Sequence, residues 1–113
     1  MAQTITELLG ANATLSNGTV TIQLADLTDS NNNPYLASPS SATASQTVAA
    51  ILAYLVRVTD GKSSDETAGI AAADFQNEKS FVTRGESSQI QQPFTINCYR
   101  PDNLSTFDPD DVI

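Results

Sequence analysis

The chain has 113 residues and a mass of 11.9 kDa, which is the length of one ordinary domain. Thirteen acids against five bases give a net charge of -8, so binding to nucleic acid or to an anionic membrane surface is not expected. Histidine is absent and Cys98 is the single cysteine, which removes the commonest general base, the commonest metal ligands and any internal disulfide. We therefore expect one domain over residues 1–113, with no enzymatic activity, no metal site and no cofactor.

The N-terminal residues include no base and no long apolar stretch. This predicts synthesis in the cytoplasm without a signal peptide. The longest apolar run, residues 48–56, has nine residues, against the roughly 20 that a membrane-crossing helix requires. No contact with a membrane is expected.

The polar surface is expected to carry few charges. Ser, Thr, Asn and Gln together make up 40 of the 113 residues, whereas only 16% are charged. One interpretation is a loop-rich protein with many turn residues. The other is that much of the surface faces protein partners, because interface cores are depleted in charge.

The first third of the chain predicts a helical turn, a hairpin and a loop. Residues 6–10 favour a single helical turn ending at a glycine. Asn17-Gly18 favours a type I′ hairpin turn, followed by Val20, Ile22 and Leu24 alternating with polar residues. Residues 26–41 are rich in turn formers and predict a long loop.

Within this loop, residues 29–33 place oxygen ligands at alternate positions, as in the first half of a calcium-binding loop. Pro34 stands where the glycine turn should be, and Ser40 replaces the bidentate glutamate. An Asx-rich turn is the favoured interpretation, and cation binding stays open.

Residues 41–58 predict the main helix, since apolar residues recur with helical spacing. Its expected core face consists of Val48, Ile51, Leu52, Leu55 and Val56. The opposite face carries Ala50, Ala53 and Tyr54 and almost no charge. Either a second layer of this protein covers that face or another subunit does, which makes these three residues candidate interaction residues.

Residues 62–74 have a mixed pattern and yield no assignment. Residues 79–84 and 89–99 flank a turn-like segment and suggest a second hairpin. Pro93 cannot donate a ladder hydrogen bond, so its strand should be an edge or be bulged, and an edge can pair with a neighbour. On the same strand, Cys98 is expected in the core.

The last segment, residues 101–113, contains four acids and no base and is expected to form an acidic tail. Because a chain end held in place needs a contact, Asp108, Asp110 and Asp111 are further candidate interaction residues. The cluster could also gather a cation, although a solvated acidic end is the simpler interpretation.

Together these patterns predict an α+β fold: an antiparallel sheet built from two hairpins, with one main helix packed on its apolar face. The expected core is Val20, Ile22, Leu24, Val48, Ile51, Leu52, Leu55, Phe81, Phe94 and Ile96. The leading functional hypothesis is a non-enzymatic structural subunit of a larger assembly, with protein partners that are copies of itself or scaffold subunits. A phage-like particle is the expected context, as a capsid-associated, cement or tail component. The alternative is a small adaptor or ligand-binding domain that uses the loop at residues 26–41.

Overall fold

The computed structural model describes residues 3–102 and 106–113 and confirms the α+β class. Within these residues the α-helices are α1 (Ile5–Leu9) and α2 (Ala44–Val58). The strands are β1 (Thr14–Ser16), β2 (Thr19–Thr21), β3 (Ile70–Asp74), β4 (Ser80–Arg84), β5 (Ser87–Gln91) and β6 (Phe94–Cys98). They pair antiparallel as β1–β2, β3–β6 and β4–β5, so the described strands form three two-stranded sheets instead of one.

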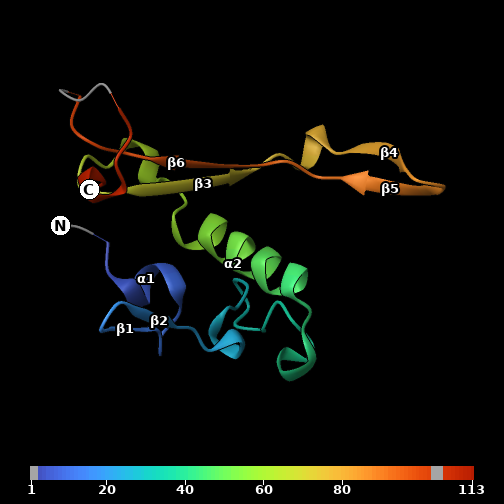
Figure 1. Ribbon diagram of the computed structural model, residues 1–113, viewed down its shortest axis with the longest axis horizontal. Coiled ribbons are helices and arrows are strands. Elements are labelled where there is room, and N and C mark those ends of the chain that lie inside the picture. Colours follow the sequence, from blue (N-terminus) through green and yellow to red (C-terminus); the bar gives the residue numbers. More distant parts are fainter. Residues whose placement is uncertain (1–2, 103–105) are drawn as a thin grey trace.

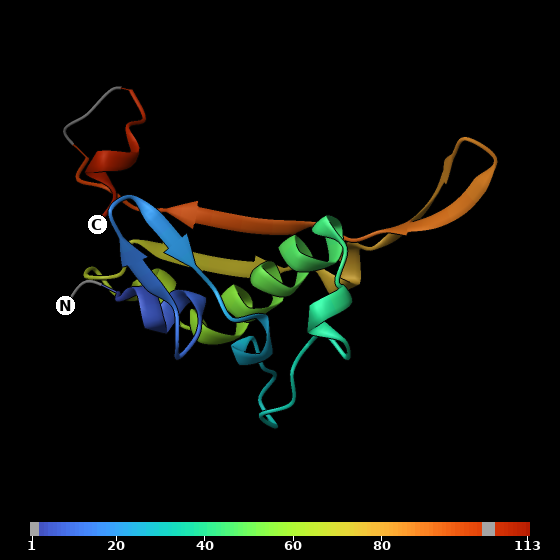
Figure 2. The same ribbon diagram turned by 60° about the horizontal axis from the view of Figure 1, so that its bottom comes forward.

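The molecule consists of a body and a projecting arm (Figure 1). In the body, the small N-terminal elements lie on one side of α2 and the β3–β6 ribbon lies on the other. The β4–β5 hairpin extends away from both (Figure 2), and we call residues 79–91, this hairpin with Lys79 before it, the arm. The radius of gyration is 15.9 Å, against about 13 Å for a compact domain of this length. The arm makes the difference, because the longest dimension of 47 Å runs along it.

The first hairpin forms as its turn sequence predicts. Asn17 and Gly18 both have positive φ, of 50° and 76°, and Leu15 pairs with Val20. The strands are only three residues long, however, and both of these apolar residues are exposed. The prediction that Val20 belongs to the core is therefore wrong. A hairpin this short covers little apolar surface of other elements, and little of its own surface is buried by them.

Helix α2 begins at a capping box, in which the Thr43 hydroxyl accepts from the Gln46 N–H and the Gln46 side chain accepts from the Thr43 N–H. It ends at Thr59, whose hydroxyl donates to the Leu55 carbonyl at 2.6 Å and accepts from the Ala72 N–H at 2.9 Å. Thr59 is buried, so these two bonds join the end of α2 to β3 inside the body.

The buried face of α2 is not the one that the spacing of its large apolar residues predicts. Ala50 and Tyr54 are 3% and 7% exposed and pack with Leu27, which is fully buried, whereas Val48 is 56% exposed. Residues 22, 24 and 36 of the N-terminal part complete this cluster. Other parts of the same chain cover the helix on two sides. The sequence left open whether this chain or another subunit covers the charge-poor face, and in the structure a second layer of the same chain does. Ala50 and Tyr54 are thus unavailable to a partner, and Ala53 is half-buried.

The second predicted hairpin is divided in two. β4 and β5 form a hairpin about Gly85 and Glu86, but the chain then breaks at Pro93, and β6 pairs with β3 in the register Ile70↔Cys98 to Asp74↔Phe94. The break follows from the missing N–H of proline. The partner strand β3 lies within residues 62–74, for which the sequence predicted no helix or strand.

This division exposes residues that the sequence placed in the core. Phe81 is 82% exposed, and Ile96 and Cys98 are exposed as well. Ile22, Leu24, Ile51, Leu52, Leu55 and Phe94 are half-buried. A two-stranded ribbon has no second layer over most of its length, so alternation along a strand does not guarantee burial there.

Candidate interaction surfaces

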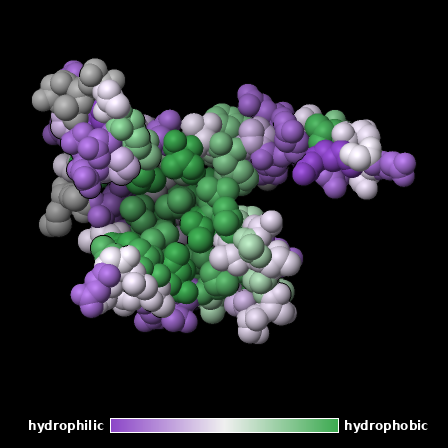
Figure 3. Space-filling view, viewed as in Figure 1, coloured by the Kyte–Doolittle hydropathy of each residue, from purple (hydrophilic) through white to green (hydrophobic). Residues whose placement is uncertain are grey.

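The arm carries an exposed apolar pair. Phe81 and Ile90 are directly opposite each other in the β4–β5 register, so their side chains lie on the same face, and they are 82% and 59% exposed. β4 and β5 pack on each other, and among the described residues no other helix or strand makes a comparable set of contacts with them. Figure 3 shows a small hydrophobic patch on an arm that is otherwise hydrophilic. Phe81 and Ile90 therefore form an apolar pair that the described part of the chain leaves uncovered.

The arm also differs from the body in charge. Residues 79–91 contain Lys79, Arg84 and one acid, Glu86, whereas the rest of the chain has three bases against twelve acids. Among the described residues, neither Lys79 nor Arg84 forms an ion pair. The positive charge of the arm is therefore available to a partner.

An open groove lies at the root of the arm, between the C-terminal half of α2 and β3. Its apolar lining comes from Val56, Phe75 and the small residues Ala72 and Ala73. Its polar lining consists of Asp60, Asp74, Asn77 and Glu78, which include three acids and no base. We call this hollow the α2–β3 groove. Its chemistry, apolar with an acidic rim, suits a ligand that is apolar and cationic.

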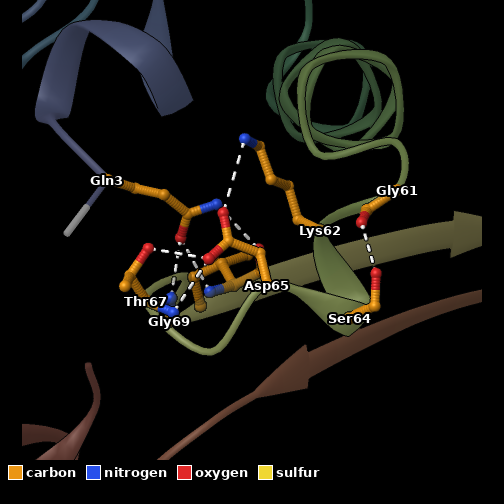
Figure 4. A network of polar contacts seen from close by, with 8 residues as sticks. Gln3, Gly61, Lys62, Ser64, Asp65, Thr67 and Gly69 are labelled. Carbon is orange, nitrogen blue, oxygen red and sulfur yellow. Dashed lines mark hydrogen bonds and ion pairs between the residues drawn. The ribbon is translucent and has the colours of Figure 1, made fainter. Parts of the chain in front are cut away.

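The two chain ends are held by the chain itself. The Gln3 side chain accepts from the N–H groups of Gly69 and Ile70, at 2.9 and 2.8 Å, and donates to the Ile70 carbonyl at 2.9 Å. Figure 4 shows this side chain reaching the start of β3. At the other end, the Ile113 N–H donates to the Tyr99 carbonyl at 3.0 Å. Gln3 and Ile113 are therefore both held by contacts within the chain.

Gly69 is the residue that lets the C-terminus close onto β3. A Cβ at this position would overlap the carbonyl oxygen of Ile113 and lie 2.8 Å from its carbonyl carbon. The requirement for glycine here is one of space, which the sequence pattern around residue 69 does not reveal.

The other predicted interaction residues are not brought together. Pro93 is half-buried between β5 and β6, where its carbonyl accepts from the Phe75 N–H. Asp108 and Asp110 are exposed and Asp111 is half-buried, around the short 3-10 turn Pro109–Asp111. Residues 103–105 of the acidic tail lie outside the described residues. Among the hydrogen bonds of the described residues, none joins Pro93 to Asp108, Asp110 or Asp111.

The Asp29 loop forms an Asx-type turn. One oxygen of Asp29 accepts from the N–H groups of Asn31 and Asn33, at 2.9 and 3.0 Å. The loop is further fixed by Arg57, whose Nε donates to the Thr28 carbonyl at 2.7 Å. The carboxylate is therefore already used by its own backbone. Over the described residues, no group of three or more His, Cys, Asp or Glu side chains is placed to hold a metal ion.

A second polar cluster surrounds Asp65, next to the Gln3 contacts (Figure 4). Its carboxylate accepts from the hydroxyl and the N–H of Thr67, at 2.7 and 2.9 Å, and lies 3.8 Å from Lys62 Nζ. The Thr67 hydrogen bonds, with a smaller contribution from Lys62, lower the pKa of Asp65 below its ordinary value of 3.8. This arrangement shapes the turn before β3 and leaves the carboxylate a poor proton donor or acceptor near neutral pH.

Neither Phe81 nor Ile90 was predicted from the sequence to be a surface residue. One signal was present: β5 contains a single apolar residue, Ile90, so the hairpin has too few apolar side chains to cover a second layer.

None of the helices formed by residues 3–102 and 106–113 has the length and apolar character to cross a membrane. Comparison with protein-family models, with curated proteins and with solved structures gave no match for this chain.

Proposed function

We propose that this protein is a non-enzymatic structural subunit of a larger multi-subunit assembly, and that the arm is the element through which it binds its neighbours. The observation that carries the proposal is the exposed Phe81–Ile90 pair on a hairpin that projects from the body. Exposing two large apolar side chains in this way costs solvation free energy, which a partner surface would recover.

The surface area supports the same conclusion. The chain exposes 7909 Å², whereas a folded monomer of 11.9 kDa is expected to expose about 5,900 Å². The difference exceeds the area that one partner contributes to an interface of standard size, about 800 Å². Among the described residues, the buried apolar set is small for a free-standing domain and consists of Ala13, Leu27, Ala50, Tyr54, Ala68 and Ala71.

A phage-like particle is the proposed setting, as a capsid-associated, cement or tail component. Small subunits with projecting hairpins suit such particles, because an arm can link one subunit to the next without a large hydrophobic core in each. The low share of charged residues, 16%, favours a surface that is partly covered by protein.

The alternative function, a small adaptor or ligand-binding domain that works through residues 26–41, has less support. In this loop, one carboxylate oxygen of Asp29 and the carbonyl oxygen of Thr28 already accept hydrogen bonds from within the chain.

Sedimentation velocity of the purified chain tests the proposal. We expect species larger than the 11.9 kDa monomer, with Phe81→Ser shifting the distribution to monomer. Gln89→Ser is the matched control, because Gln89 lies in the same hairpin on the opposite face from Ile90. A wild-type chain that stays monomeric over a wide range of concentration would contradict the proposed function.

A further inference from the structure

We propose that the arm of one copy of this chain binds in the α2–β3 groove of a second copy. The inference rests on the proposed function and adds the identity of the partner and the surface that receives the arm. It is carried by three observations: the chemistry of the arm, the chemistry of the groove, and the position of the groove relative to the arm of the same chain.

The arm and the groove are complementary. The arm offers Phe81 and Ile90 on one face, with Lys79 and Arg84 at the two ends of β4. The groove offers apolar walls from Val56 and Phe75, with Ala72 and Ala73 leaving room for a ring. Its rim carries Asp60, Asp74 and Glu78, so an arm with net positive charge is attracted to it.

A second copy is the occupant favoured by charge. Outside residues 79–91 the chain has twelve acids and three bases, so two bodies repel each other wherever acid meets acid. The contact of an arm with the groove instead brings a segment with a net charge of +1 against a rim with three acids. It also covers the aromatic side chain that the monomer leaves most exposed among its large hydrophobic residues.

The arm cannot enter the groove of its own chain. Phe75, Asn77 and Glu78 line the groove and also form the connection from β3 to β4, so the groove lies at the root of the arm. The hairpin then leads away from the body (Figure 1). Because groove and arm adjoin, two copies can exchange arms reciprocally, with each arm seated at the root of the other.

Two variants remove the two halves of the contact separately. Phe81→Ser removes the apolar anchor of the arm. Ala73→Arg fills the groove with a bulky cation at an exposed position, where folding should be spared. Phe107→Ser and Ala11→Arg are the matched controls, each making the identical substitution at another exposed position. Circular dichroism establishes that all four variants are folded.

Association is then measured by sedimentation velocity, for each variant alone and for an equimolar mixture of the first two. Phe81→Ser and Ala73→Arg alone should each weaken association at least about thirtyfold, the loss that removal of a hot-spot residue produces. The mixture should associate again, because the Ala73→Arg chain has an intact arm and the Phe81→Ser chain an intact groove. Both controls should associate like the wild type.

Asp60→Asn provides a second groove variant, which removes one rim charge without adding bulk. This exposed substitution at the rim should weaken association about fivefold, and added salt should weaken wild-type association.

Three results would overturn the inference. They are wild-type association by the Ala73→Arg variant, a mixture that does not associate, and tighter association in high salt. If Phe81→Ser still dissociates the protein in those cases, the proposed function stands and the arm binds a different surface. If the wild-type chain is itself monomeric, that result would instead contradict the proposed function.

Discussion

The body and the arm differ in what holds them in place. In the body, α2 is covered from two sides, and Thr59 links its end to β3 through buried hydrogen bonds. In the arm, β4 and β5 are held by their ladder and by the tight turn at Gly85, with an apolar pair left in solvent. An isolated two-stranded hairpin is only marginally stable in water. The body therefore determines whether the chain folds, and the arm contributes little to folding.

The largest effect is expected in the centre of the body. Leu27 is fully buried against Ala50 and Tyr54, so Leu27→Ala should lower the free energy of unfolding by about 2 to 5 kcal/mol, through lost burial and the cavity left behind. Chemical denaturation followed by circular dichroism measures this. Leu15→Ala is the control, since Leu15 is 61% exposed and its loss should cost no more than about 0.5 kcal/mol. Equal losses for the two variants would show that the body has no such centre.

A smaller effect is expected where α2 meets β3. Thr59→Val keeps the size of the side chain but removes the hydroxyl that bonds Leu55 and Ala72, and should cost about 1 to 3 kcal/mol. The Ala72 amide should also exchange its hydrogen faster, which hydrogen-exchange NMR detects. Thr19→Val, at an exposed strand position, should leave both quantities nearly unchanged. If the Ala72 amide exchanges at the same rate in Thr59→Val, the hydroxyl of Thr59 does not join α2 to β3 as described.

The turn before β3 should add a modest dependence of stability on pH. The pKa of Asp65 is lower in the folded chain than its ordinary value of 3.8, so its contribution is fully present above that value. The contribution is lost as the pH falls through the lowered pKa. The stability difference between wild type and Asp65→Asn should therefore shrink in acid, as denaturation at several pH values would show. A difference that grows in acid would mean the opposite shift.

The smallest effect on folding is expected in the arm. Phe81→Ser should change the free energy of unfolding of the monomer by no more than about 0.5 kcal/mol, because the side chain is 82% exposed. Thermal unfolding of dilute, monomeric protein tests this. A large loss would show that Phe81 packs within its own chain and would remove the distinction between arm and body.

Local signals in the sequence specified the elements that depend on neighbouring residues. Asn17-Gly18 specified the first hairpin and its register, and Thr43 with Gln46 formed a capping box close to the predicted start of α2. Pro93 interrupted its strand, as a residue without an N–H must. Each of these outcomes follows from backbone angles or hydrogen bonds that span only a few residues.

The candidate site required information that no local pattern contains. Ala50 and Tyr54 became core residues because Leu27, far away in the chain, packs on them. Phe81 became a surface residue because β6 pairs with β3 and leaves β4 and β5 to themselves. The groove exists only where α2 and β3 adjoin.

The sequence by itself thus determined the α+β class, the first turn, the main helix and the shortage of charge. Tertiary structure decided which faces are buried, how the strands divide into sheets, and which apolar residues are left for a partner. The physical reason is that turns and caps are fixed by interactions between near neighbours. Burial and strand pairing are instead decided by competition among all segments of the chain for a small amount of apolar surface.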